Sequence, residues 1–135
     1  MASNKRFHEI IRFGVSGVAG FIVDAGLIAI FTQAFGLGPI VAQLIGFTAA
    51  VTVTWLINRH WTFAEHASDK WLHEWTRYVA ANSIGAAVNN GVYVGLVLGL
   101  SAFSKIPVLA VAIGSIAGMG FNFLASKRLI FRALN

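Results

Sequence analysis

Four long apolar stretches follow one another along the chain, separated by short polar segments. They run from about Phe13 to Ala34, Pro39 to Ile57, Tyr78 to Leu100 and Pro107 to Ser126. A membrane-spanning helix needs about 20 predominantly apolar residues. The stretches are apolar on nearly every face rather than along one stripe, which excludes a soluble helical bundle. The pattern therefore predicts an all-α polytopic membrane protein with four transmembrane helices.

The basic residues predict how these helices are oriented. Nine of the ten lie before the first stretch, between the second and third, or after the fourth: Lys5, Arg6, Arg12, Arg59, Lys70, Arg77, Lys127, Arg128 and Arg132. Cytoplasmic segments are enriched in Lys and Arg. We therefore expect both termini and the middle loop in the cytoplasm, and the protein in the cytoplasmic (inner) membrane. These charges flank spans, so they suit anionic lipid better than nucleic acid.

Composition narrows the possible chemistry. Hydrophobic residues make up 57% of the chain and charged residues 11%, whereas a soluble domain has about 25% charged residues. There is no cysteine, and none of the four histidines has a metal-ligand spacing, so no metal site is expected. No phosphate-binding loop, dinucleotide fingerprint or catalytic set of polar residues is found either. We expect neither a cofactor nor an enzyme.

The middle loop has a helical pattern of its own. Residues 68–79 read SDKWLHEWTRYV, in which Trp71, Trp75 and Tyr78 recur on one helical face. Glu74 and the flanking Lys and Arg would then face the lipid headgroups. This pattern predicts a short interfacial helix. A simple aromatic anchor without a further role is the alternative.

The chain also contains an internal duplication. A shift of 65 residues aligns the beginnings of the first and third stretches, with Asp24 falling on Asn89. A shift of 68 residues places the segment Asn58–Phe63 on Ser126–Phe131. We predict one transmembrane domain over 1–135, made of two repeated helical hairpins at about 10–63 and 75–131. Parallel repeats of this kind are related by an axis along the membrane normal, and a transporter would place its substrate site at the seam between them.

Several polar residues fall within or at the end of the apolar stretches: Asp24, Asn58, Asn82, Asn89, Asn90 and Asn122. A carboxylate at the bilayer centre costs about 2.5–3.5 kcal/mol, so Asp24 needs protonation, a partner or a wet cavity. Arg12 is about 18 Å away along a helix and is too distant to pair with it. We expect Asp24 to meet another helix or a substrate. The alternative is a hydrogen-bonding bracket to Asn89 or Asn90 that holds helices together.

A second candidate group is basic and lies at the cytoplasmic ends of the spans: Arg12, Arg59, Arg77, Lys127 and Arg128. The planar guanidinium fork suits a phosphate group. These residues are predicted to bind a substrate phosphate. Ordinary flanking charges with snorkelling side chains are the alternative.

These stretches resemble the GtrA-like family of small four-span membrane proteins. The similarity lies in RFGVSG from Arg12 with Asp24, in NRHWTF from Asn58, and in the segment from Asn122 to Phe131. It covers about residues 12–131. One departure is Leu129-Ile130, where the family tends to repeat an aromatic residue followed by valine or threonine.

The resemblance implies movement of a polyprenyl-phosphate-linked sugar, such as undecaprenyl-phosphate glucose, from the cytoplasmic to the outer leaflet. That sugar would modify O-antigen, teichoic acid or a related cell-surface polysaccharide. A membrane glycosyltransferase that makes the lipid-linked sugar is the implied partner. The basic group would receive the phosphate, and Asp24 with the asparagines would replace water around the sugar. Asp24 would otherwise take a proton and couple movement to the gradient.

Two other functions stay open at this stage: a membrane anchor or activator of a glycosyltransferase without transport, and a small proton-coupled exporter. Four thin helices enclose little space, and small residues recur at intervals of four in the last span, which suits close helix packing. We therefore expect a homodimer, resembling small multidrug transporters in architecture.

Overall fold

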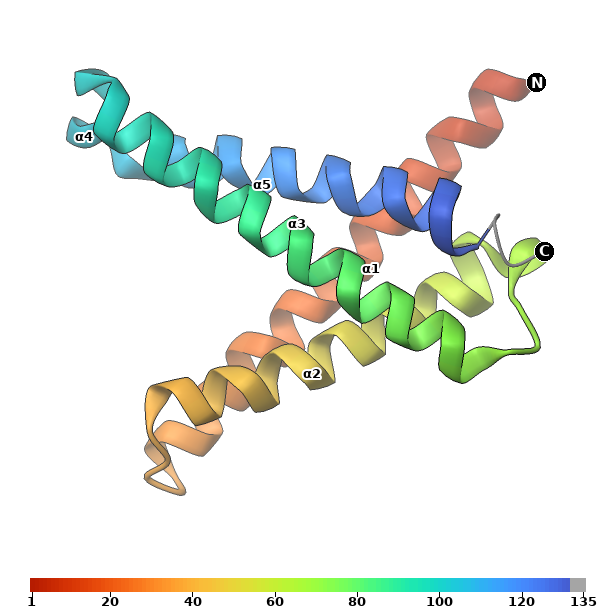
Figure 1. The fold of residues 1–135 in the computed structure, drawn as a ribbon, viewed down its shortest axis with the longest axis horizontal. Helices are drawn as coiled ribbons and strands as arrows, with labels where there is room; N and C mark the ends of the chain where they lie inside the picture. Colours follow the sequence, from red (N-terminus) through yellow and green to blue (C-terminus); the bar gives the residue numbers. More distant parts are fainter. Residues whose placement is uncertain (132–135) are drawn as a thin grey trace.

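The computed structural model describes residues 1–131 and consists of two long helical hairpins that cross each other (Figure 1). The elements are α1 (Ala2–Gln33), α2 (Pro39–Ile57), η1 (Asn58–Thr62), η2 (Ala64–His66), α3 (Trp71–Gly99), α4 (Ser101–Lys105), α5 (Pro107–Ala125) and η3 (Ser126–Ile130). Helices α1 and α2 form the first hairpin, and α3 and α5 form the second. No strand occurs among residues 1–131. Arg132, one of the cationic residues used for orientation, lies outside the described residues.

The two hairpins turn at sequence signals for helix ends. Between α1 and α2 the chain reverses through Gly36, whose φ of 65° is in the left-handed region that favours glycine. Pro39 then opens α2, and Pro107 opens α5 after the short α4. Proline is well placed there because the first helical N–H has no intrahelical partner. Both helices begin at the residues predicted from the sequence.

Three described helices are long and apolar enough to cross a membrane: Ala2–Gln33, Pro39–Thr62 and Pro107–Ile130. The protein is thus all-helical and multi-pass within residues 1–131, as predicted. Helix α3 has 29 residues, about 43 Å at 1.5 Å per residue, so its length is sufficient. Its three asparagines lower its hydropathy, so α3 is long enough to cross a membrane but less apolar than the three helices above.

The predicted short interfacial helix is wrong, because α3 begins at Trp71 and continues to Gly99 without a break. The aromatic face that indicated a membrane surface is mostly turned into the protein. Tyr78 is buried, and the Trp75 indole donates to the Thr52 hydroxyl at 3.1 Å. Trp71 is exposed. The same spacing therefore arises from packing against the first hairpin.

Within each hairpin, small residues let the helices approach closely. An added Cβ at Gly46 would lie 2.6 Å from the Asp24 carboxylate of the neighbouring helix. In the second hairpin, a Cβ at Gly118 would lie 2.9 Å from both the Gly85 carbonyl oxygen and the Asn89 Cβ. Such close approach is typical of helix pairs in membranes. Each hairpin is consequently a tightly packed unit.

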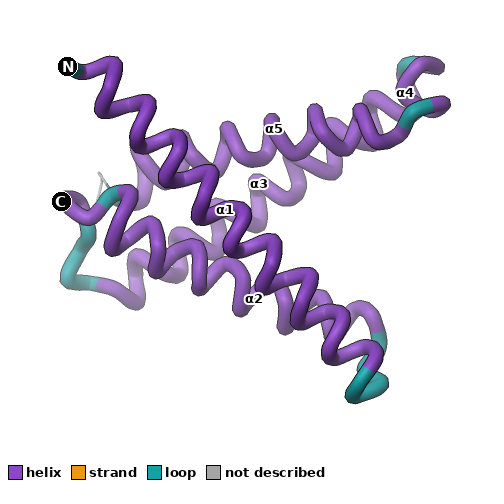
Figure 2. The backbone as a smooth tube through the Cα atoms, turned by 180° about the vertical axis from the view of Figure 1, so that it is seen from behind, coloured by secondary structure: helices purple, strands orange, loops and turns teal. Residues whose placement is uncertain are grey.

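The two hairpins meet mainly at one end and separate toward their turns, as the tube in Figure 2 shows. The meeting end holds the apolar core: Phe13, Val51, Trp55, Phe63, Tyr78, Ile130 and Phe131. The early part of α1, the connection 58–70 and η3 gather there, and these segments carry most of the basic residues. We call this the charged end of the molecule.

Both α2 and α5 change at the charged end into a short π-helix, η1 and η3. The Phe63 N–H donates to the Asn58 carbonyl at 2.8 Å, and the Phe131 N–H donates to the Ser126 carbonyl at 2.9 Å. In a π-helix these bonds join residues five apart. The wider turn brings the first and last of them to one face, and all four residues are buried. Residues aligned by the shift of 68 thus have the same local structure.

Candidate functional site

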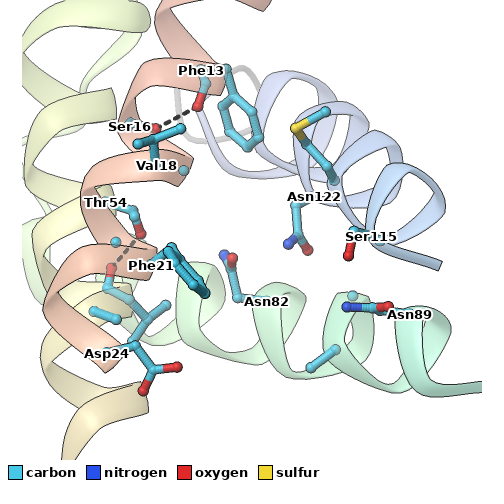
Figure 3. A pocket seen from close by; sticks show the side chains of 18 of the residues that line it. Phe13, Ser16, Val18, Phe21, Asp24, Thr54, Asn82, Asn89, Ser115 and Asn122 are labelled. Carbon is cyan, nitrogen blue, oxygen red and sulfur yellow. Dashed lines mark hydrogen bonds between the residues drawn. The ribbon is translucent and has the colours of Figure 1, made fainter. Parts of the chain in front are cut away.

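A cavity of about 490 Å³ lies between the two hairpins. Its walls come from α1, α2, α3 and α5, and much of its lining is apolar or glycine. The hydrogen-bonding side chains that line it are Ser16, Asp24, Thr54, Tyr78, Asn82, Asn89, Ser115 and Asn122. Figure 3 shows this cavity with most of these side chains labelled. Four of the six polar residues predicted to meet a sugar therefore border one space: Asp24, Asn82, Asn89 and Asn122.

The amides all come from the second hairpin. Asn82 and Asn89 lie on α3, Asn122 lies on α5, and the amides of Asn82 and Asn122 point toward the same part of the cavity (Figure 3). Asn82 donates to the Tyr78 carbonyl of its own helix at 2.9 Å. The Oδ1 of Asn122 is buried without a hydrogen-bond partner among the described residues. One wall of the cavity is therefore rich in amides with hydrogen-bonding capacity to spare.

Asp24 is on the other wall, half-buried on α1, and Figure 3 shows it apart from the amides. Its carboxylate lies against α2 beside Gly46. Within residues 1–131 its Oδ1 is buried without a hydrogen-bond partner, so no bracket to Asn89 or Asn90 is formed. Asn90 itself is exposed and lies outside the cavity lining.

Asn58, the remaining polar candidate, belongs to a buried hydrogen-bonded group at the charged end. It has no exposed surface. Its Oδ1 accepts from Ser16 at 3.0 Å and from Thr62 at 2.8 Å, and its Nδ2 donates to the Tyr78 hydroxyl at 2.9 Å. Asn58 therefore joins α1, η1 and α3, and its position gives a sugar no access to it.

Arg59 is held by a buried carboxylate that the sequence patterns had placed at the lipid surface. Glu74 of α3 is fully buried, and it accepts from the Arg59 guanidinium at 2.7 Å and from the Trp55 indole at 2.9 Å. Its second oxygen accepts from the Ser68 backbone N–H at 2.8 Å. The expectation that Glu74 faces headgroups is wrong, because its buried carboxylate accepts from three donors of the protein. Arg59 is consequently engaged inside the protein.

Lys127 also has an acidic partner, since its ammonium pairs with Glu9 of α1. Arg12 has a different environment: it lies over the Trp61 ring, 5.4 Å from the ring centroid, and donates to the Trp61 carbonyl at 3.2 Å. Arg12 borders a second cleft of about 280 Å³ at the charged end, which contains Lys5 and other charged side chains. The basic candidates therefore differ in their partners: Arg59 and Lys127 pair with carboxylates, whereas Arg12 contacts Trp61.

Arg77 and Arg128 complete the basic group. Arg77 is half-buried and Arg128 is exposed. Among residues 1–131 neither has a carboxylate within ion-pair distance. These two, and the Arg12 guanidinium that also lacks a carboxylate, remain able to meet an anion from outside the chain.

The residues missed by the sequence analysis are mainly carboxylates and hydroxyls that hold the hairpins together. Glu9 and Glu74 are related by the same shift of 65 that aligns Asp24 with Asn89. Arg59 and Lys127 are related by the shift of 68. The signal for two equivalent ion pairs was therefore present in the repeat. In the described part of the chain, no group of three or more His, Asp or Glu residues is arranged to hold a metal ion.

Helices of spanning length, arranged as crossing hairpins around a partly polar cavity, define a multi-pass membrane protein. A family model described as "GtrA/DPMS, transmembrane domain" matches residues 12–131. The chain belongs to this GtrA/DPMS family, in agreement with the resemblance seen in its motifs. The matched region begins at Arg12 and ends at Phe131, so it contains the whole cavity and most of the charged end.

Proposed function

We propose that this protein binds a polyprenyl-phosphate-linked monosaccharide between its two hairpins and moves it across the cytoplasmic membrane for cell-surface glycosylation. Membership of the GtrA/DPMS family supports the handling of polyprenyl-linked sugars. The observation that carries the proposal is the wall of amides in the cavity, from Asn82, Asn89 and Asn122. A sugar hydroxyl both donates and accepts hydrogen bonds, and an amide does the same.

The cavity has a suitable size and lining for this cargo. Small-molecule sites have volumes of about 300–1,000 Å³ and are mostly apolar, with a few placed polar groups. The cavity of about 490 Å³ is within that range. A monosaccharide would occupy the amide wall, while its polyprenyl chain stays in the lipid. Asp24, on the opposite wall, would accept a hydrogen bond from the sugar or take a proton during movement.

The phosphate would be met at the charged end. Arg12, Arg77 and Arg128 have guanidinium groups without carboxylate partners in residues 1–131, whereas Arg59 and Lys127 are paired. An Arg–phosphate contact is a charge-assisted and often bidentate hydrogen bond. In this proposal the charged end and both termini face the cytoplasm. A phosphate would therefore be received on the side where a glycosyltransferase makes the lipid-linked sugar.

In this proposal helix α3 also crosses the membrane, which brings the number of spans to four. It packs along α5, which is itself long and apolar enough to cross the membrane. Its asparagines lower its hydropathy, but two of the three line the cavity rather than face lipid. Intramembrane polar residues commonly face a bundle interior or a cavity in this way.

The expected homodimer stays a prediction. One copy already forms a cavity large enough for a small ligand, so its volume does not require a second copy. The membrane glycosyltransferase is a proposed partner in the same sense, as the supplier of the lipid-linked sugar.

Reconstitution in liposomes tests the function directly. Polyprenyl-phosphate glucose with a radiolabelled sugar is placed in both leaflets, and a membrane-impermeant oxidant reports the fraction that reaches the outer leaflet. We expect the wild type to make the whole pool accessible and Asn82→Ala and Asn122→Ala to slow this several-fold. Ser83→Ala is the matched control, because Ser83 is exposed and its hydroxyl donates to the Val79 carbonyl of its own helix.

If liposomes with the wild-type protein expose no more labelled lipid to the oxidant than protein-free liposomes, transport is contradicted. In that case, stimulation of a co-reconstituted glycosyltransferase would favour the anchor or activator function instead.

A further inference from the structure

Two ion pairs cross between the hairpins at positions related by the internal repeat. Arg59 of the first hairpin pairs with Glu74 of the second at 2.7 Å, and Lys127 of the second pairs with Glu9 of the first. Each cation also lies over an aromatic ring four residues earlier, Trp55 or Phe123, at 5.7 Å from the ring centroid. The hairpins are thus linked twice at the charged end, by ion pairs at positions that the repeat makes equivalent.

The two links differ in their surroundings. Glu74 is fully buried and accepts two further hydrogen bonds, from Trp55 and from the Ser68 backbone. The Lys127 and Glu9 side chains are 31% and 15% exposed, and the described residues provide no additional donor to Glu9. Breaking a buried pair leaves an uncompensated charge and is costly, whereas a partly exposed pair contributes little because water replaces the partner. The Glu9–Lys127 link is therefore the easier one to open.

The weaker link is next to the cavity. Glu9 and Phe13 are four residues apart on α1, and Phe123 and Lys127 are four residues apart along α5 and η3, so each pair shares one helical face. The Phe13 and Phe123 rings contact each other edge to face, with centroids 5.4 Å apart. Phe13 also lines the cavity. An ion pair and an aromatic contact thus lie one turn apart in the seam between α1 and α5, with the cavity beyond them.

We infer that this seam, formed by Glu9–Lys127 and Phe13–Phe123, is the gate through which the cavity opens toward the charged end. The Glu74–Arg59 group is the fixed joint about which the hairpins separate. The inference rests on the proposed function and specifies its moving part: the hairpins are closed at the charged end and apart at their turns in this structure. Opening the seam breaks the weak Glu9–Lys127 ion pair and makes the amide wall accessible from the charged end.

Reaction of a single cysteine in the cavity tests the gate without measuring transport. The chain has no native cysteine, so Asn82→Cys provides one thiol for an impermeant maleimide added at the charged end. We expect Glu9→Lys, which places two like charges at the seam, to raise the labelling rate about fivefold or more. The exchange Glu9→Lys with Lys127→Glu should restore the slow rate. Lys5→Glu is the matched control, because Lys5 of α1 pairs with Glu65 of η2 rather than with a residue of α5 or η3.

A second experiment joins the two sides of the seam. Glu9→Cys with Lys127→Cys, bridged by a short reducible bis-thiol reagent, should stop transport in liposomes, and a reductant should restore it. Lys5→Cys with Glu65→Cys, bridged in the same way, links α1 to η2 without crossing the seam and should leave transport intact. Equal labelling rates in all charge variants, or full transport with the seam bridged, would overturn the gate. Charge variants of Asn82→Cys that label as expected, together with wild-type protein that moves no lipid, would contradict the proposed function alone.

Discussion

Phe63 stacks on Phe131, with ring centroids 4.9 Å apart and ring planes inclined by 25°. The two residues follow η1 and η3, and the shift of 68 that relates the hairpins also relates these two positions. Both side chains are buried. A residue that contacts its own repeat counterpart lies on the axis relating the repeats. The stack therefore marks the centre of the interface between the hairpins.

This stack should give a measurable coupling energy. We expect Phe63→Ala and Phe131→Ala to destabilise the fold, and the double variant to lose less than their sum, with a coupling of about 0.5–1.5 kcal/mol. Denaturation in detergent, followed by circular dichroism, measures the three free energies of unfolding. Phe35→Ala is the control because its ring is largely exposed. Strictly additive effects would show that the rings do not interact in the folded protein.

Glu74→Gln tests the joint at the charged end. The change removes the charge that Arg59 pairs with and leaves the guanidinium largely buried without a counter-ion. Loss of one partner of a buried pair costs about 3–5 kcal/mol, so the unfolding transition should move to a clearly lower denaturant concentration. Asp69→Asn is the matched control, since Asp69 is nearby and exposed. Equal stability of the two variants would argue against a buried ion pair.

Gly118→Ala and Gly120→Ala form a matched pair on α5. A Cβ at position 118 would lie 2.9 Å from the Gly85 carbonyl oxygen of α3, whereas at position 120 it would meet no atom of residues 1–131 within 4 Å. Overpacking of this kind costs about 1–3 kcal/mol, so Gly118→Ala should unfold at lower denaturant. Gly120→Ala should be neutral or slightly stabilising, because alanine favours a helix over glycine by about 0.5–1 kcal/mol. A reversed order would mean that α3 and α5 do not approach as closely as described.

Substitution of Arg77 should affect transport, whereas substitution of Arg59 should affect stability. Arg77→Gln should fold like the wild type but need about tenfold more lipid substrate for half-maximal transport, because a hydrogen bond to a charged group contributes about 1.5–3 kcal/mol. Arg59→Gln should chiefly lower the unfolding free energy, since its main partner is Glu74. Transport at varied substrate density, measured beside unfolding in detergent, separates the two effects. An unchanged substrate requirement in Arg77→Gln would remove this residue from the proposed phosphate site.

Much of the fold could be predicted from the sequence, and the candidate site only in part. The starts of α2 and α5 agree with the predicted spans because proline and the preceding turn residues act locally. Asn82 and Asn122 reach the cavity as expected, since polar side chains within a span avoid lipid. Asn58, predicted to meet the sugar, is instead fully buried among protein partners. The position of Asn58 in the sequence carries no information on whether Tyr78 lies opposite it.

The sequence by itself determined the helical membrane class, the places where the hairpins turn and the positions that the repeat makes equivalent. Apolar length, proline and glycine signals and recurrent spacing are properties of neighbouring residues, so they can be read without the fold. Only the tertiary structure decided that Glu74 is buried beside Arg59 and that Lys127 meets Glu9 across 118 positions of sequence. Such pairings depend on how two finished hairpins cross, and that crossing follows from the combined packing of all their contacting side chains.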